Sequence, residues 1–214
     1  MKKAAFYTLG CKVNQYETEA MAELFADSGY EIKEFTEVAD VYVINTCSVT
    51  NMGDRKSRQI IRRAKKLNPN AVIAVTGCYA QTAPDEVLAI EGVNLILGTK
   101  DRKNIVTLVE ELNTESNINH VSDIMSNHEF EELQIKQYSN RTRAFIKIQE
   151  GCNQFCSYCI IPYARGPVRS RAKDDVVREI KELAHNGFKE IILVGIHVAS
   201  YGVDLGDTTL ESLI

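Results

Sequence analysis

The sequence has 214 residues, which is enough for one or two domains. Hydrophobic residues make up 44% and charged residues 25%, a balance typical of folded globular proteins and not of disordered or fibrous chains. The formal net charge is −4, so a polyanionic partner has to be bound by a local basic patch. The first residues, MKKAAFYTLGCKVN, lack the apolar run of a secretion signal or a membrane span, which predicts a cytoplasmic protein that does not contact a membrane.

The first half of the chain alternates short β-branched runs with longer amphipathic runs. We predict strands at residues 4–9, 41–46, 71–76 and 94–97, a weaker strand at 30–35, and helices at 14–28, 54–67, 84–90 and 102–112. This alternation indicates βαβ units and an α/β domain with a doubly wound parallel sheet. We assign residues 1–113 to this domain.

The rest of the chain divides into a polar segment and a second unit. Residues 114–140 are polar and show no sustained periodicity, which predicts a linker or an irregular crossover. Residues 141–214 then start a second βαβ pattern, with a strand at 144–149, a helix at 174–186 and a strand at 190–194. About 74 residues are few for a closed α/β domain, so we expect this unit to be truncated and the chain to be part of a longer protein.

The sharpest motif is a group of three cysteines directly after a predicted strand. Cys152, Cys156 and Cys159 are spaced as Cys-x3-Cys-x2-Cys, with no fourth cysteine or histidine within ten residues. A structural zinc site has four ligands, whereas three thiolates leave one iron of a 4Fe–4S cluster open to a substrate or cofactor. The spacing therefore favours a catalytic cluster. A zinc knuckle completed by a distant residue such as His197, or inert buried cysteines, are the alternatives.

The other three cysteines, Cys11, Cys47 and Cys78, each follow a predicted strand. Because parallel strands end at the same edge of a sheet, we expect the three thiols to lie close together where open α/β sheets bind ligands. The alternative is that each is simply buried in the core. All six cysteines are expected to be reduced in the cytoplasm, which favours metal or redox chemistry over disulfides.

Basic residues are concentrated after both groups of cysteines. The helix after Cys47 and the segment after Cys159 carry the candidates for contacts with RNA phosphates, which are Arg55, Lys56, Arg58, Arg62, Arg63, Arg165, Arg169 and Arg171. A solvated helix face is the alternative for the first group, and structural salt bridges are the alternative for the three later arginines.

These motifs together resemble those of the radical S-adenosylmethionine methylthiotransferases, over nearly the entire chain. The resemblance rests on TLGCKVNQYETE, DVYVINTCSVTNMGDRKSRQ, VTGCYAQ and KIQEGCNQFCSYCIIPYARGPVRSR. GCKVN and CIIPYARGPVRSR are most similar to the branch that acts on N6-threonylcarbamoyladenosine in tRNA. The resemblance implies an N-terminal methylthiotransferase domain followed by the first βα units of a partial radical-domain α/β barrel.

The resemblance also implies two 4Fe–4S clusters. Cys152, Cys156 and Cys159 would hold the cluster whose open iron binds S-adenosylmethionine, and the auxiliary cluster would be held by Cys11, Cys47 and Cys78. Gly195, in LVGIHVASYG, matches a glycine near this cofactor, whereas no role is implied for His197. The implied reaction adds a methylthio group to carbon 2 of N6-threonylcarbamoyladenosine at tRNA position 37, next to the anticodon.

The implied partners are tRNA, a reducing protein such as flavodoxin or ferredoxin, and a sulfur donor, and we expect a monomer. An incomplete barrel cannot shield a radical from water, so we expect this part of the protein to be inactive or poorly active alone. Sister branches that act on isopentenyladenosine in tRNA or on a ribosomal protein aspartate are alternatives. A non-catalytic RNA-binding module with zinc or redox-active thiols is the alternative from another class.

Overall fold

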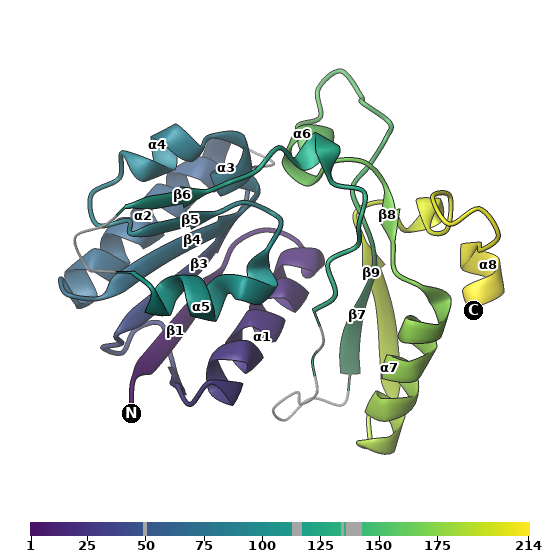
Figure 1. Ribbon diagram of the computed structural model, residues 1–214, viewed down its shortest axis with the longest axis horizontal. Coiled ribbons are helices and arrows are strands. Elements are labelled where there is room, and N and C mark those ends of the chain that lie inside the picture. The colour runs from purple at the N-terminus through teal and green to yellow at the C-terminus, as the bar shows by residue number, and fades with distance from the viewer. Residues whose placement is uncertain (49–50, 113–116, 134, 136–142) are drawn as a thin grey trace.

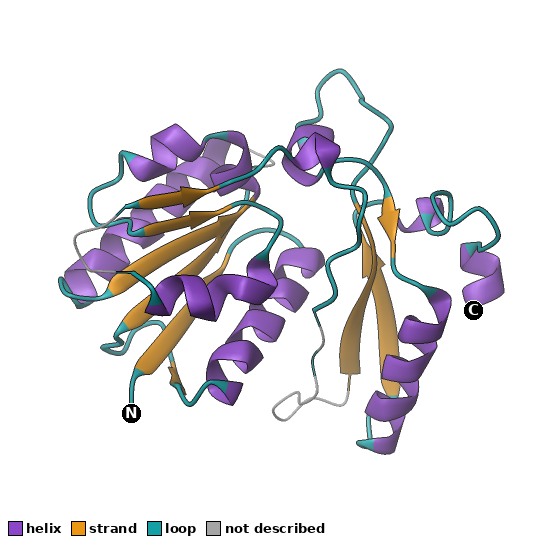
Figure 2. Ribbon diagram, in the orientation of Figure 1, coloured by secondary structure: helices purple, strands orange, loops and turns teal. Residues whose placement is uncertain are grey.

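The protein is described by a computed structural model that covers residues 1–48, 51–112, 117–133, 135 and 143–214. The chain forms two α/β units, each built around its own sheet (Figure 1 and Figure 2). Within the described ranges, no helix is long and apolar enough to cross a membrane.

The first sheet consists of six parallel strands in the order β2-β1-β3-β4-β5-β6. The strands are β1 (Lys3–Thr8), β2 (Glu31–Lys33), β3 (Val41–Thr46), β4 (Val72–Gly77), β5 (Leu95–Leu97) and β6 (Ile118–His120). The strand order changes direction between β1 and β3. In open α/β sheets such a switch point opens a crevice beside the carboxyl ends of the strands, where ligands bind.

Helices cover both faces of this sheet, which confirms the predicted doubly wound fold (Figure 1). One face is covered by α1 (Lys12–Asp27), the 3₁₀ turn η1 (Arg102–Asn104) and α5 (Ile105–Glu110), and the other by α2 (Asn51–Leu67), α3 (Cys78–Thr82) and α4 (Pro84–Leu88). Phe25 packs against the first face and Ile61 against the second. Because both faces are covered, the β3 sequence VYVINT is buried throughout its length.

The second unit has a three-stranded sheet in the order β8-β7-β9. Its elements are β7 (Arg143–Glu150), α6 (Ile161–Arg165), β8 (Arg169–Ser170), α7 (Lys173–His185), β9 (Glu190–Gly195), the 3₁₀ turn η3 (Val198–Ser200) and α8 (Leu210–Leu213). On one face of β7, Ile146 and Ile148 pack in a cluster with Val176 and Leu183 of α7. Toward the first unit, β7 contacts α1, so the strand is buried on both faces.

The segment at residues 114–140, predicted as a linker or an irregular crossover, contains two short regular elements among its described residues. Ile118–His120 form β6, which pairs in parallel with β5 at the edge of the first sheet, and a 3₁₀ turn, η2, follows at Ile124–Ser126. Leu133 and Ile135 pack against Tyr16 of α1. The side chains of β6 are exposed and the strand is held by its main chain, so its sequence carries no alternation of polar and apolar residues.

Gly77 ends β4 in a backbone conformation, with φ of +95° and ψ of −166°, that is essentially restricted to glycine. An added Cβ would also overlap the main-chain oxygen of Thr46. We therefore expect Gly77→Ala to lower the free energy of unfolding by about 3 kcal/mol, measured by urea denaturation. Gly29 is a matched control, because it also has a positive φ, of +85°, but an added Cβ meets no atom within 4 Å. Gly29→Ala should cost about 1 kcal/mol, and equal losses in the two variants would contradict the steric argument.

Candidate functional site

The first three cysteines all lie at the carboxyl edge of the first sheet. Cys11 follows β1 and is the N-cap residue of α1, Cys47 directly follows β3, and Cys78 is the first residue of α3 after β4. Since β1, β3 and β4 are adjacent parallel strands, the three thiols lie at one edge, beside the β1/β3 switch point. The predicted placement of these cysteines at a common edge is confirmed.

The backbone before Cys11 lies directly against Cys47. A Cβ added to Gly10, whose φ is +105°, would be 3.0 Å from the Cβ and 3.1 Å from the Sγ of Cys47. The two turns are held together by Asn14, whose Nδ2 donates to the main-chain oxygens of Leu9 at 2.7 Å and Thr46 at 3.0 Å. A glycine at position 10 therefore keeps the space between Cys11 and Cys47 free of side-chain atoms.

The three thiols differ in burial. Cys11 is exposed, Cys47 is half-buried and Cys78 is buried. Burial raises the pKa of the Cys78 thiol, against the effect of the Arg165 guanidinium, whose Nε donates to Cys78 Sγ at 3.3 Å. A pocket of about 520 Å³ opens beside Cys11, lined by Thr8, Gly10, Cys11, Lys12, Gln15 and Glu19. This edge is therefore open to solvent on the Cys11 side and closed by the second unit on the Cys78 side.

The second group of cysteines lies in the loop between β7 and α6. Cys156 is exposed, and Cys152 and Cys159 are half-buried. The loop is held by main-chain hydrogen bonds from Cys152 to Gly166, at 3.0 Å, and from Cys159 to Cys156, at 2.9 Å. Three exposed aromatic side chains flank the thiols, namely Phe155, Tyr158 and Tyr163. The loop thus presents three thiols together with an uncovered aromatic surface.

The described residues contain no group of three or more His, Cys, Asp or Glu side chains that could hold a single metal ion. A zinc ion needs its ligands to converge on one point, whereas each thiolate of a 4Fe–4S cluster binds a different iron atom. Three thiols at one glycine-lined edge, as at Cys11, Cys47 and Cys78, match the number of thiolates that leaves one iron of a 4Fe–4S cluster open.

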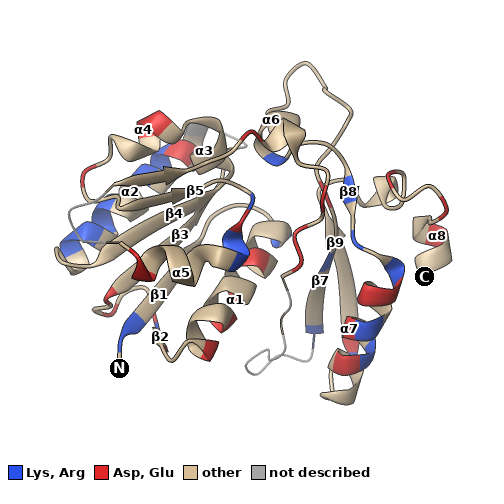
Figure 3. Cartoon of the chain, viewed as in Figure 1, with Lys and Arg blue, Asp and Glu red and all other residues tan. Residues whose placement is uncertain are grey.

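Basic residues are concentrated along α2 (Figure 3), and most of the candidate RNA contacts on this helix are exposed. Arg55, Lys56, Arg62 and Arg63 are exposed. Arg58 is half-buried because its Nη1 donates to the hydroxyl of Tyr79 at 2.9 Å. The helix face is therefore accessible to a polyanion, and RNA binding by these residues stays a prediction.

The prediction that Arg165, Arg169 and Arg171 contact RNA is contradicted by their burial. All three side chains are at most 1% exposed and pair with carboxylates. Arg171, for example, forms an ion pair with Glu179 of α7. The alternative of structural salt bridges is therefore correct for this group, since a phosphate cannot reach these guanidinium groups.

Arg165 and Arg169 belong to a buried ion-pair network that joins the two units. Its members come from α1, η1, the segment after η2, β7, α6 and β8, and are Glu17, Arg102, Glu131, Lys147, Glu150, Arg165 and Arg169. Arg102 pairs with Glu17 at 2.6 Å and with Glu131 at 2.8 Å, and Lys147 pairs with Glu17 at 3.2 Å and with Glu150 at 3.1 Å. We define these seven residues as the interunit network.

Most of this network was not identified from the sequence, although two signals for it are present. Lys147 interrupts the apolar run AFIKI, and Glu17 lies four residues from both Val13 and Met21 on the buried face of α1. A charged residue at a buried position of a periodic pattern indicates an ion pair, because an unpaired charge is too costly to bury. The sequence does not show which opposite charges complete the pairs.

Gly195 lies at the end of β9, where its backbone meets Gln149 of β7. A Cβ at Gly195 would be 2.9 Å from Gln149 Oε1, the atom that also accepts a hydrogen bond from the main-chain N–H of His197 at 2.8 Å. The His197 side chain is hydrogen-bonded through Nδ1 to Ser200 Oγ. A cofactor contact at Gly195 stays a prediction, and His197 has the structural partner expected of a non-catalytic histidine.

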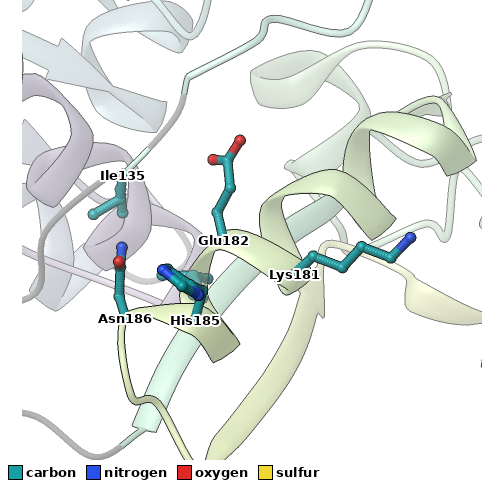
Figure 4. Close-up of a pocket in the computed structure, with 6 residues that line it drawn as sticks. Ile135, Lys181, Glu182, His185 and Asn186 are labelled. Atoms are coloured by element: carbon teal, nitrogen blue, oxygen red, sulfur yellow. The ribbon is translucent and has the colours of Figure 1, made fainter.

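A further pocket, of about 410 Å³, lies at the end of α7 (Figure 4). Its lining is formed by Ile135, Lys181, Glu182, Leu183, His185 and Asn186. None of the cysteines is among these residues, so this pocket is separate from both thiol groups.

The interunit network makes stability depend on pH through Glu17. Burial alone would raise the pKa of Glu17, but the charges of Arg102, Arg165 and Lys147 outweigh burial and lower it to about 2. Ionised Glu17 therefore stabilises the fold above its unfolded pKa, and this contribution is lost as the pH falls from about 4.5 toward 2. We expect Glu17→Gln to lower the free energy of unfolding at pH 7 by about 3 kcal/mol, with the deficit shrinking as the pH falls to about 3.

Urea denaturation of both forms at each pH measures this difference. Glu34→Gln, at an exposed carboxylate of the same unit, should change stability by less than about 0.5 kcal/mol at either pH. A Glu17→Gln deficit that stays constant from pH 7 to pH 3 would show that the lost stability is not electrostatic.

Two family models match the chain. Residues 3–98 match the uncharacterized protein family UPF0004, and residues 146–211 match the radical SAM superfamily. UPF0004 and radical SAM regions imply iron–sulfur clusters and S-adenosylmethionine, so the cofactor class expected from the cysteines agrees with the family models.

The relatives are tRNA methylthiotransferases of two kinds. The chain is 53% identical to threonylcarbamoyladenosine tRNA methylthiotransferase MtaB of Bacillus subtilis (strain 168), covering 100% of this chain and 48% of that protein. It is 44% identical to the MtaB protein of Aquifex aeolicus, over 95% of this chain and 50% of the relative. It is 35% identical to tRNA-2-methylthio-N(6)-dimethylallyladenosine synthase of Dictyoglomus thermophilum, over 100% of this chain and 49% of the relative. The chain thus spans about half the length of the curated relatives it matches, and over nearly all of its own length it is similar to MtaB-type methylthiotransferases.

Proposed function

We propose that this chain is the cluster-binding part of a tRNA methylthiotransferase that modifies carbon 2 of N6-threonylcarbamoyladenosine at position 37. The observation that carries the proposal is the contact between α3, which begins at Cys78, and α6, which begins two residues after Cys159. This contact places the helix that begins at Cys78 beside the helix that follows the second group of cysteines (Figure 1). A reaction that delivers sulfur to an unactivated carbon needs a sulfur source and a radical source beside one substrate.

In this proposal each of the two units holds one iron–sulfur cluster. Cys11, Cys47 and Cys78 hold an auxiliary 4Fe–4S cluster at the edge of the first sheet, and Cys152, Cys156 and Cys159 hold the cluster that binds S-adenosylmethionine in the second unit. When bound, these groups supply the radical chemistry and the sulfur that the side chains of the protein cannot supply themselves. The chain's own contribution is to position the thiols of the first sheet through Gly10 and Asn14, and to fix the two units relative to each other through the interunit network.

The proposed RNA substrate is bound through the exposed basic face of α2. This helix begins near Cys47, at the carboxyl edge of the sheet, so its first basic residues lie beside the auxiliary site. Because the whole chain carries a net charge of −4, such a local basic face is what phosphate binding requires. We further propose a reducing protein, such as flavodoxin or ferredoxin, and a sulfur donor as partners of the complete enzyme.

The choice among the sister branches follows from the degree of similarity. The chain is 53% identical to a threonylcarbamoyladenosine enzyme and 35% identical to a dimethylallyladenosine enzyme. Substrate choice is a property of side chains, so the more similar relative is the better guide. We therefore favour N6-threonylcarbamoyladenosine as the substrate over isopentenyladenosine or a ribosomal protein aspartate.

Counting iron tests the cofactor assignment. After anaerobic reconstitution with iron and sulfide, we expect about eight irons and about eight sulfides per chain, because each group of three cysteines holds one 4Fe–4S cluster. Replacing Cys11, Cys47 and Cys78 together by alanine should leave about four irons, and so should the same replacement of Cys152, Cys156 and Cys159.

The two triple variants also control for each other. S-adenosylmethionine should change the electron paramagnetic resonance spectrum only of the variant that keeps Cys152, Cys156 and Cys159, because the cofactor binds the open iron of that cluster. A colourless protein that binds zinc and no iron would overturn the proposal and favour the zinc-binding module.

Charge reversal on α2 tests the proposed RNA surface. We expect Arg62→Glu combined with Arg63→Glu to weaken binding of tRNA about 10-fold or more at 150 mM salt, and to reduce the salt dependence of binding, because phosphate contacts are lost. Fluorescence anisotropy with labelled tRNA measures both effects. Lys181→Glu combined with Lys189→Glu makes the same charge change at exposed positions of the second unit. Equal weakening in both double variants would mean that the chain binds tRNA only through its overall charge.

A further inference from the structure

Arg165 follows one group of proposed cluster ligands in the sequence and contacts a cysteine of the other group. It lies six residues after Cys159, at the end of α6, and its Nε donates a hydrogen bond to the Sγ of Cys78, across the interface between the units. The side chains of both residues are buried, so water does not compete for this hydrogen bond. The arginine of the second unit is therefore a neighbour of a proposed ligand in the first unit.

The other two side-chain nitrogen atoms of Arg165, Nη1 and Nη2, form hydrogen bonds with side chains of both units. Its Nη1 is 2.6 Å from Glu17 Oε1 and 2.6 Å from Glu150 Oε1, and its Nη2 contacts Glu17 Oε2 at 3.1 Å and Asn14 Oδ1. Glu150 lies two residues before Cys152, and Asn14 accepts from Cys11 Sγ at 3.7 Å. The planar guanidinium is thus fixed in orientation by Asn14, which contacts Cys11, and by Glu150, which is close to Cys152 in the sequence.

The interunit network contains more positive than negative charge. It has four cations, Arg102, Lys147, Arg165 and Arg169, and three carboxylates, Glu17, Glu131 and Glu150, all buried. When all seven groups are ionised, the network therefore has a net charge of +1. A 4Fe–4S cluster held by three thiolates is an anion, and the sulfur that faces the network is Cys78 Sγ. The network therefore has a net positive charge and directly contacts a sulfur that would belong to such an anion.

We propose that Arg165 is a positioning residue of the auxiliary cluster, which hydrogen-bonds the sulfur of Cys78 from the second unit and raises the reduction potential of that cluster. This inference rests on the proposed function. A hydrogen bond and a positive charge at a ligand sulfur stabilise the reduced, more negative state of an iron–sulfur cluster. The same contact ties the auxiliary site to the loop that carries Cys152, Cys156 and Cys159.

The test uses the full chain in which Cys152, Cys156 and Cys159 are replaced by alanine, so that only the auxiliary cluster is loaded. Redox titration followed by electron paramagnetic resonance gives its one-electron midpoint potential. We expect Arg165→Gln to shift the potential to a more negative value, and Arg165→Lys to shift it less, because lysine keeps the charge but loses the fixed Nε hydrogen bond.

Arg102→Lys is the matched control. Arg102 is equally buried and pairs with the same Glu17 and Glu150, but Arg102 has no hydrogen bond to a cysteine among the described residues. This variant should lose stability in urea denaturation of the iron-free chain and keep the parental potential. An unchanged potential in folded Arg165→Gln that carries about four irons would overturn the inference and leave the proposed function intact. Failure of the unsubstituted chain to bind iron at this site would overturn both.

A second measurement does not require any variant to fold. The cluster-loaded chain is prepared with ¹⁵N-labelled arginine, and nitrogen couplings of the reduced auxiliary cluster are recorded by pulsed electron paramagnetic resonance. A hydrogen bond from Arg165 Nε to Cys78 Sγ should give a weak coupling that changes from the ¹⁴N to the ¹⁵N pattern on labelling. Spectra that are identical with and without the label would contradict the proposed contact.

Discussion

The arrangement of the two units depends on the interunit network of buried ion pairs. Removing charges from water costs several kcal/mol per ion, and this cost is offset only where each ion has close partners in good geometry. Glu17 meets that condition by accepting from Arg102 at 2.6 Å and from Arg165 at 2.6 Å. Interfaces between domains of one chain usually permit relative motion. Here a rotation of the units would separate charges that no water replaces, so the network fixes their relative position.

The placement of the three thiols at the edge of the first sheet depends on the backbone and not on ion pairs. Adjacent parallel strands bring Cys11, Cys47 and Cys78 to one edge, and the β1/β3 switch point opens the sheet there. Close approach of two turns then requires Gly10, where a side chain would contact Cys47. The strand order thus determines the edge of the sheet at which the thiols lie. The small residues at the turns determine how close the thiols are to one another.

The sequence was sufficient to predict strands β1 to β5 of the first sheet, both groups of cysteines and the exposed basic face of α2, because periodicity and local spacing encode them. Strand β6 could not be predicted, since Ile118–His120 pair through the main chain and have exposed side chains without alternation. Arg165 was misassigned to RNA for a related reason. An arginine in the run YARGPVRSR has the same local sequence whether it faces solvent or Glu17, and only tertiary structure places a carboxylate beside it.

Arginine therefore has two roles in this protein. The presence or absence of neighbouring carboxylates determines which role a given arginine has. The exposed arginines on α2 are free to approach a polyanion, whereas Arg165 is surrounded by Glu17 and Glu150 and is directed at a cysteine sulfur. A rigid interface has a consequence for chemistry at the two thiol groups. Under the proposed function, a fixed interface would set the separation of the two clusters when the protein folds, and the substrate would have to move to the site. The proposed reaction would then be controlled through substrate positioning and not through closure of these two units.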